Sequence, residues 1–136
     1  EHTMSPIVQD WFGSLGFTVY GECGYCGSIV DHVGVCGDVI VACEMKNGTS
    51  GVVRQAYRNQ VFADESWVAV RANPENIIEA CRGFGLGLLW IIRDRPFAVC
   101  APKQTPKNAP WKPMKEQMLR NMIDYAPWGA GGIAFR

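Results

Sequence analysis

The sequence predicts an α/β fold in which helices cover a mixed central sheet. Two observations support this prediction. Short apolar runs rich in Val and Ile alternate with segments of helical periodicity along the first hundred residues. These segments follow one another as one helix, three strands, a helix, a strand, a helix and two strands. We expect residues 1–100 to form this core. Residues 101–136 should add a Lys- and Pro-rich arm and a C-terminal helix to the same single domain.

The first half of the chain carries clear boundary signals. Residues 4–15 have an apolar stripe at helical spacing, and Pro6 suits the first turn of that helix. Residues 29–35 and 39–45 read as strands, and Cys36-Gly37-Asp38 between them predicts a tight hairpin. Asp38 therefore has a role in the turn, which leaves Asp31 as the better candidate for a functional carboxylate.

The later elements are predicted from similar signals. Ser50 is expected to cap a helix over residues 51–62, and Asn73 with Pro74 should begin another over residues 73–82. We further expect strands at 17–22, 66–70, 86–92 and 97–100, a Gly- and Cys-rich loop at 21–28, and a last helix at 114–125.

Composition excludes some classes of protein. The chain has 136 residues and no net charge, with 13 basic and 13 acidic side chains, which weighs mildly against a nucleic-acid partner. A local basic patch is still expected, because four lysines and no acid lie between Lys103 and Lys115. No apolar run approaches the roughly 18–20 residues of a membrane span, and the N-terminus lacks a signal-peptide pattern. Six cysteines in a chain with ample apolar residues favour a reducing cytoplasm.

The most informative segment is the apolar run from Val39 to Lys46. It has the length and β-branched content of a strand buried on both faces, yet it ends in Glu44 and Lys46. Side chains two residues apart leave the same face of a strand, so these two charges project together. Asp31 on the neighbouring strand can bring a second carboxylate to them. Two carboxylates beside a lysine favour a site for a divalent cation and an anionic substrate.

This arrangement resembles the PD-(D/E)xK nuclease superfamily, in particular its resolvase-like and uncharacterised phosphodiesterase-like branches. An acid, then a buried strand ending in Glu-x-Lys, is the motif that carries the resemblance. The segments at 16–22, 54–58, 63–70 and 85–89 are also similar to the family's strands and post-motif helix. The resemblance covers about residues 4–92, and it implies a restriction-endonuclease-like core of α-βββ-αβ order. Val30 stands where the family usually has proline.

The resemblance implies roles for individual residues. Asp31 and Glu44 would bind Mg²⁺ or Mn²⁺, with the backbone carbonyl of Met45 as a further oxygen ligand. Lys46 would orient the attacking water or stabilise charge on the phosphate. Gln55 resembles a glutamine of the helix after the motif, which reaches the site or the nucleic-acid backbone.

Other assignments stay open from the sequence. Glu44 and Lys46 could form a solvent-exposed ion pair at a strand end, and Asp31 could be an exposed acid on an edge strand. Gln55 could equally lie on a solvated helix face. Glu22 is a second candidate ligand. The further acid that the family often carries on its first helix could only be Glu1 or Asp10.

Cys23 and Cys26 form a lone C-x-x-C. A structural zinc site normally needs four ligands, and no second pair follows at finger spacing, although His32 is near in sequence. The open alternatives are zinc binding, a redox pair and simple loop packing.

Several basic side chains could contact phosphates, and Trp111 could stack on an unpaired base. The basic candidates are Arg54, Arg58, Lys103, Lys107, Lys112 and Lys115, and solvated surface charge is the alternative for each. Our leading hypothesis is a metal-dependent nuclease that hydrolyses phosphodiester bonds in DNA, which could be branched or single-stranded. The compact size suggests a homodimer, or a module whose specificity lies in a partner. Its rival is a non-catalytic nuclease-fold module that binds nucleic acid or protein. A thiol or zinc protein is a third hypothesis.

Overall fold

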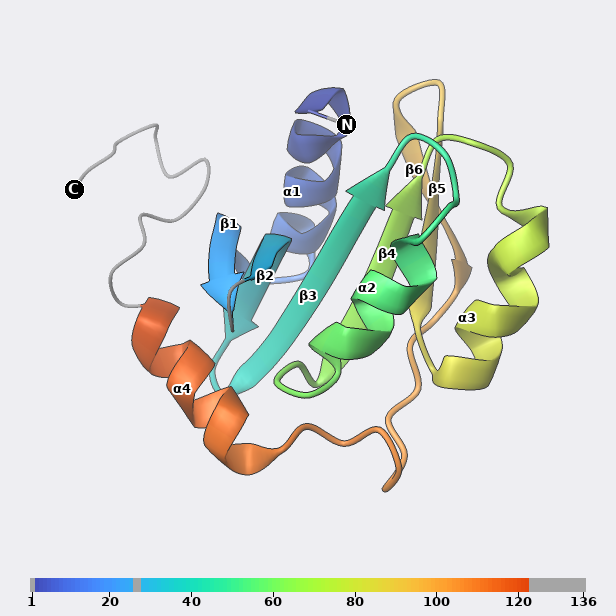
Figure 1. Ribbon diagram of the computed structural model, residues 1–136. Coiled ribbons are helices and arrows are strands. Elements are labelled where there is room, and N and C mark those ends of the chain that lie inside the picture. Colours follow the sequence, from blue (N-terminus) through green and yellow to red (C-terminus); the bar gives the residue numbers. More distant parts are fainter. Residues whose placement is uncertain (1, 26–27, 123–136) are drawn as a thin grey trace.

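The computed structural model describes residues 2–25 and 28–122. Within them, six strands form one mixed sheet in sequence order, from β1 to β6 (Figure 1). The strands are β1 (Thr18–Tyr25), β2 (Ser28–Cys36), β3 (Val39–Lys46), β4 (Glu65–Val70), β5 (Gly87–Ile92) and β6 (Arg95–Cys100). The β3–β4 and β4–β5 pairs are parallel, and the other pairs are antiparallel. The predicted mixed α/β fold is therefore confirmed.

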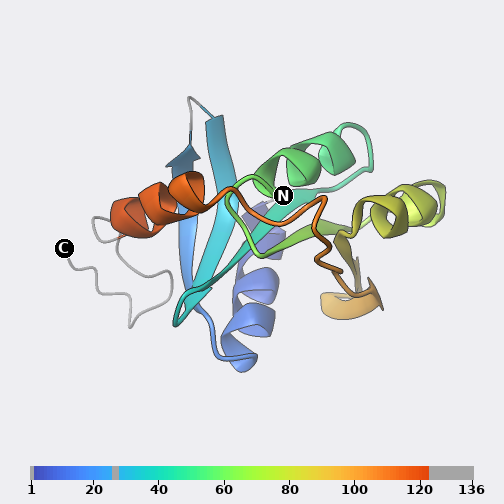
Figure 2. The same cartoon turned by 90° about the horizontal axis from the view of Figure 1, so that it is seen from below.

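The helices divide between the two faces of this sheet. They are η1 (His2–Met4), α1 (Ser5–Ser14), α2 (Val52–Asn59), η2 (Glu75–Ile77), α3 (Ile78–Phe84) and α4 (Lys112–Met122). Figure 2 shows α1 on one face and α2, α3 and α4 on the other. In β3, Cys43 and Met45 pack toward α1, whereas Ala42 contributes to the opposite core. Glu44, which alternates with Cys43 and Met45, therefore faces the layer that contains α2.

The β2–β3 hairpin has the predicted tight turn. Cys36 pairs with Val39, so the turn consists of Gly37 and Asp38, and Gly37 has the positive φ of 62° that this turn requires. The pairing continues as far as His32 and Cys43 and then stops, although β2 begins at Ser28 and β3 ends at Lys46. The two strands thus separate at the end where Asp31 and Glu44 lie.

Three local predictions are wrong. Residues 21–25 of the predicted 21–28 loop belong to β1, which continues to Tyr25 and pairs Cys23 with Val30 of β2, while residues 26 and 27 lie outside the described residues. The N-cap of α2 is Gly51 rather than Ser50, and no side chain caps this helix. The helix also ends at Asn59, earlier than predicted, in a turn that leads into β4. The last helix was predicted to reach Tyr125, which lies outside the described residues.

The segment between β6 and α4, which we call the arm (residues 101–111), lies against the end of α3. The backbone N–H of Lys103 donates to the carbonyl of Gly85 (3.0 Å), and the Asn108 side chain donates to the carbonyls of Phe84 (3.2 Å) and Lys103 (2.9 Å). Beyond the arm, Lys115 of α4 forms a half-buried ion pair with Asp64 (2.8 Å). Both ends of the segment are therefore held against the sheet and its helices.

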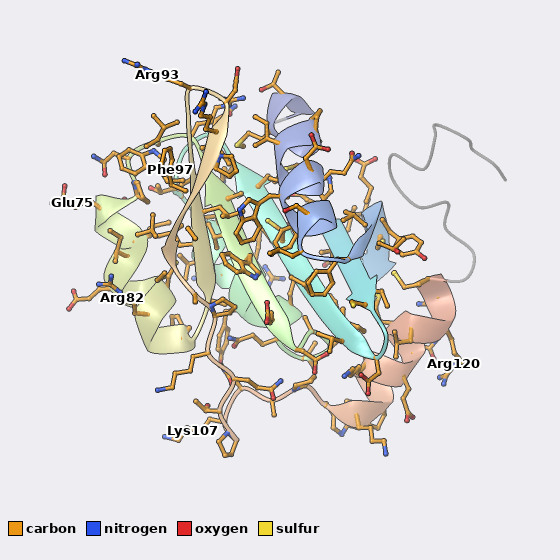
Figure 3. The ribbon with its side chains drawn as sticks, turned by 180° about the vertical axis from the view of Figure 1, so that it is seen from behind. Glu75, Arg82, Arg93, Phe97, Lys107 and Arg120 are labelled. Atoms are coloured by element: carbon orange, nitrogen blue, oxygen red, sulfur yellow. The ribbon has the colours of Figure 1, made fainter. Side chains whose placement is uncertain are left out.

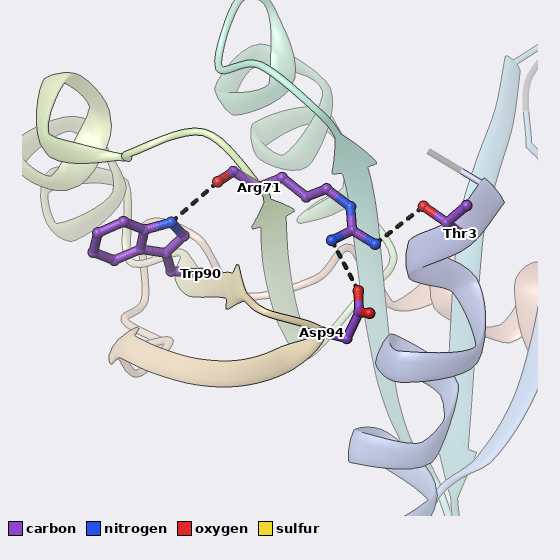
Figure 4. Close-up of polar contacts among 4 residues, drawn as sticks. All are labelled: Thr3, Arg71, Trp90 and Asp94. Carbon is purple, nitrogen blue, oxygen red and sulfur yellow. Dashed lines mark hydrogen bonds and ion pairs between the residues drawn. The ribbon is translucent and has the colours of Figure 1, made fainter.

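At the opposite end of the sheet from the arm, Arg71 joins three elements (Figure 4). Its guanidinium donates to the Thr3 hydroxyl (3.0 Å) and pairs with Asp94 in the β5–β6 turn (3.1 Å). The Trp90 indole donates to the Arg71 carbonyl (3.2 Å). Asp94 is largely exposed, so this ion pair contributes little to the free energy of unfolding. Its effect is to orient the β5–β6 turn.

A test of the fold concerns Gly87, which pairs with Trp67 in the parallel β4–β5 register. A Cβ at position 87 would lie 2.3 Å from the Trp67 ring, which is itself packed beneath Trp11 and Phe12 of α1. We expect Gly87→Ala to reduce the free energy of unfolding by roughly 1–3 kcal/mol, measured by urea denaturation. Gly13→Ala in α1 is the matched control, because a Cβ there meets no atom within 4 Å. It should leave stability unchanged or raise it by up to about 1 kcal/mol. Equal effects of the two substitutions would contradict the packing described.

Candidate metal centre

The separation of β2 from β3 creates the candidate site. Beyond the last paired residues, the Asp31 carboxylate accepts a hydrogen bond from the backbone N–H of Met45 (2.8 Å). The side chain thus takes the place of the missing ladder partner and draws Asp31 against β3. There it lies in hydrogen-bonding contact with the Glu44 carboxyl group. The structure therefore brings together the two carboxylates that the sequence singled out.

Glu44 is buried beneath α2, with only 4% of its surface exposed. Its Oε2 atom accepts a hydrogen bond from the Asn59 side chain of α2 (2.8 Å). Burial raises the pKa of Glu44 to about 7, the Asn59 hydrogen bond opposes this shift, and the neighbouring Asp31 adds to it. Below about pH 7 the Glu44 carboxyl is protonated and can donate to Asp31. Above that pH two negative charges face one another in a site that is only partly accessible to water, and a cation would relieve their repulsion.

Asn59 was not identified from the sequence. It lies one helical turn after Gln55, and residues four apart share a helix face. A buried asparagine on the face that carries Gln55 is the signal that could have revealed it.

A small pocket of about 70 Å³ lies beside Glu44, and Gln55, Arg58 and Asn59 of α2 line it together with residues 28–30 of β2. Gln55 therefore lies at the pocket beside Glu44, and Arg58 brings a guanidinium to the same pocket. A larger hollow of about 860 Å³ adjoins it and shares Gln55 and Arg58 with it. The pocket beside buried Glu44 is therefore connected to an open surface through two polar side chains of α2.

Lys46 leaves β3 two residues after Glu44, on the same face, but its ammonium does not lie in the small pocket. It donates a hydrogen bond to the backbone carbonyl of Ser50, in the loop before α2, and it lines the larger hollow. The structure therefore places Lys46 two residues after Glu44 on β3 and engages its ammonium with a loop carbonyl at the larger hollow.

The donor set fits a small, hard cation that retains most of its water. Asp31 and Glu44 supply two carboxylates, and the carbonyl of Met45 leaves the strand on the same side as its N–H, toward Asp31. Mg²⁺ is commonly held by one or two carboxylates and several waters. Within residues 2–25 and 28–122, no group of three or more His, Cys, Asp or Glu side chains is arranged to hold a metal ion.

The other acids considered are less well placed. Glu22 is exposed on β1, at a position with φ of 51°. Asp10 is exposed on α1, which covers the other face of the sheet, and Glu1 lies outside the described residues.

The side chains predicted to contact nucleic acid lie in different places. Four of them are exposed and line the hollows around α2: Arg54, Arg58, Lys103 and Lys107. Trp111 is 61% exposed at the end of the arm. Lys112 is exposed as well. Lys115 was predicted as a phosphate contact, but its ammonium is engaged by Asp64.

The predicted C-x-x-C loop is also different in the structure. Cys23 is fully buried within β1, and burial raises the pKa of its thiol to about 12. Such a thiol is a poor nucleophile and a poor metal ligand at neutral pH. Its sequence partner Cys26 lies outside the described residues.

Comparison with known proteins identifies no family. No model of a known protein family matches the chain, and no curated protein matches it. Among solved structures, it is similar to the SPO1766 protein of unknown function from Silicibacter pomeroyi, with 19% sequence identity and a TM-score of 0.59. The match covers 88% of this chain and 84% of that one, and it shows a shared fold. In the part of the chain that the structure describes, no helix is long and apolar enough to cross a membrane.

The pKa of Glu44 predicts how stability depends on pH. The pKa is higher in the folded state, at about 7, than the ordinary value of 4.5. The carboxyl group therefore contributes stability that is present in full below about pH 4.5 and is lost as the pH rises through 7. Glu44→Gln mimics the protonated acid, because its amide can accept from Asn59 and donate to Asp31. Without divalent cations, we expect this variant to be more stable than the parent at pH 8.5, by roughly 1–3 kcal/mol, and nearly equal at pH 4.5.

Urea denaturation in the presence of EDTA measures this difference. Glu116→Gln is the control, because Glu116 is exposed on α4 and should show no such pH dependence. A Glu44→Gln variant that is less stable than the parent at pH 8.5 would show that Glu44 is not a buried, strained acid.

Proposed function

We propose that the protein is a metal-dependent phosphodiesterase of the PD-(D/E)xK type that cleaves DNA. The observation that carries the proposal is the contact between half-buried Asp31 and buried Glu44 at the splayed ends of β2 and β3. Burying the Glu44 carboxyl beside a second, half-buried acid is costly unless the two pair or bind something, so the pair favours a binding role. The order of elements around the pair also supports a restriction-endonuclease-like core, in which three antiparallel strands precede a helix and a parallel strand.

The side chains around the pocket can be given roles. Asp31, Glu44 and the Met45 carbonyl would hold the cation, which when bound would lower the pKa of a coordinated water and offset charge on the phosphate. Asn59 fixes the orientation of Glu44 through its 2.8 Å hydrogen bond and is a positioning residue. Gln55 can orient water or a phosphate oxygen at the pocket mouth. Arg58 can bind the phosphate that enters beside it.

Lys46 has to change partner to take part in the reaction. Its ammonium is bonded to a loop carbonyl, which a lysine can exchange for a phosphate oxygen by rotating its flexible side chain. The charge would then reach the anionic substrate from the larger hollow.

The alternative is a non-catalytic nuclease-fold module that binds nucleic acid or a protein partner. The engagement of Lys46 with Ser50 supports it, since the lysine is not directed at the carboxylates. The expected homodimer remains a prediction under both proposals.

Cleavage assays test the proposal directly. Supercoiled, branched and single-stranded DNA would be incubated with the protein and Mg²⁺ or Mn²⁺, with EDTA as the blank. We expect cleavage by the parent, and a loss of at least about 100-fold in rate for Asp31→Asn, Glu44→Gln and Lys46→Met. Each substitution removes a charge while keeping the side chain close to its original size.

Glu116→Gln is the matched control, since this acid lies on α4 away from the pocket, and its rate should equal that of the parent. Calorimetric titration with Mn²⁺ would measure metal binding independently of cleavage. It would therefore distinguish a protein without nuclease activity from an inactive preparation. Cleavage that survives Glu44→Gln would rule out this site, and DNA binding without cleavage by the parent would favour the non-catalytic module.

A further inference from the structure

Two aromatic rings face solvent on the surface formed by α2 and α3. Tyr57 of α2 is 51% exposed and Phe84, at the end of α3, is 44% exposed. Their ring centroids are 4.8 Å apart and the ring planes are inclined by 48°. Large apolar side chains that cluster on a surface commonly mark a binding site, whereas scattered single ones need no explanation.

The two rings stand between two hollows. The hollow of about 860 Å³ described above is lined by both rings, and so is a second hollow of about 390 Å³ on the other side. Lys46, Arg54 and Arg58 line the first. Arg82, Lys103 and Lys107 line the second, and Figure 3 shows Arg82 projecting from α3 and Lys107 from the arm. We call these two hollows and the rings between them the basic groove.

The charge of the basic groove is one-sided. Neither hollow is lined by an Asp or a Glu, although the chain as a whole has as many acidic as basic residues. Six cations around an aromatic pair complement a partner with flat rings and regularly spaced negative charges. A polynucleotide has both features, since its phosphates bind Lys and Arg and its bases stack on aromatic side chains.

The rings also indicate that the bound nucleotide is unpaired. In a duplex each base is covered above and below by its neighbours, so only a single strand can place a base face against Tyr57 or Phe84. Arg58 lines both the basic groove and the small pocket beside Glu44. A strand in the groove would therefore bring a phosphate within reach of the candidate metal centre.

From these contacts we infer that the basic groove binds single-stranded DNA, with one unpaired base stacked on the Tyr57–Phe84 pair and the flanking phosphates at Arg54 and Arg58 on one side and Arg82 and Lys107 on the other. The inference rests on the proposed function in two respects: the choice of DNA over RNA, and the role of the nearby Asp31 and Glu44 as metal ligands. Binding itself needs neither metal nor catalysis.

Fluorescence anisotropy with a labelled 12-nucleotide oligothymidine in EDTA tests the inference. We expect this strand to bind at least 10-fold more tightly than a blunt 12-base-pair duplex or than oligouridine of equal length. Tyr57→Leu and Phe84→Leu should each weaken binding by roughly 5- to 100-fold, because leucine keeps apolar bulk but cannot stack. Tyr57→Phe should bind within about 2-fold of the parent.

Phe97→Leu is the matched control. Phe97 is 52% exposed, close to the exposure of Tyr57, but it lies on the edge strand β6 (Figure 3). It should bind like the parent. Circular dichroism and thermal unfolding would confirm that each variant is folded. Ring variants that are folded and bind within 2-fold of the parent, or a preference for duplex or for oligouridine, would overturn the inference.

The salt dependence of binding gives a second measurement. Arg58→Gln and Arg82→Gln should each reduce the slope of log K against log salt concentration by about 0.7, the value for one phosphate contact to a single strand. An unchanged slope in both variants would contradict the placement of the strand.

These results can be separated from those of the cleavage assay. Binding is measured in EDTA, so no divalent metal takes part in it. Stacking-dependent binding without any cleavage would reject the proposed function alone. Cleavage that is unaffected by the loss of either ring would reject this inference alone.

Discussion

Beyond His32 and Cys43, β2 and β3 no longer pair, and the Asp31 carboxylate spans the gap by accepting the Met45 N–H. This hydrogen bond has two effects. It compensates a backbone donor that would otherwise lack a ladder partner, and it holds one acid against Glu44. The site is assembled around Glu44, whose pKa is raised mainly by burial and further by the neighbouring Asp31, and which also accepts from Asn59 and lines the small pocket.

Helix α2 connects this buried chemistry to the surface. Its inner face supplies Ala56 to the core and Asn59 to Glu44, while Gln55 and Arg58 line the pocket. Its outer face exposes Tyr57. A helix of eight residues thus combines packing, orientation of an acid and contact with the proposed strand. Changes on its outer face could alter what binds without disturbing the sheet below.

Much of this arrangement could be predicted from the sequence. The apolar run ending in Glu44 and Lys46 predicted a buried strand, and the i, i+2 spacing correctly placed both charges on one face. What the sequence could not supply was the direction of a long side chain, because the Ser50 carbonyl competes for Lys46 through a loop of unknown conformation. The glycines and cysteines of residues 21–28 predicted a loop, but pairing with β2 overrode that local preference. The Tyr57–Phe84 contact joins two helices, and no spacing within either one reveals it.

The arm illustrates how a connection can lower the entropy lost on binding. Gly85, with φ of 71°, allows the arm to approach α3 closely. A Cβ at this position would lie 2.3 Å from the Lys103 carbonyl oxygen. Asn108 closes the arm onto the same point through its two donated hydrogen bonds. The backbone that carries Lys103 and Lys107 is thus already immobilised before any anion arrives. Only the rotamer freedom of the two side chains remains to be lost, so these lysines are preorganised for association.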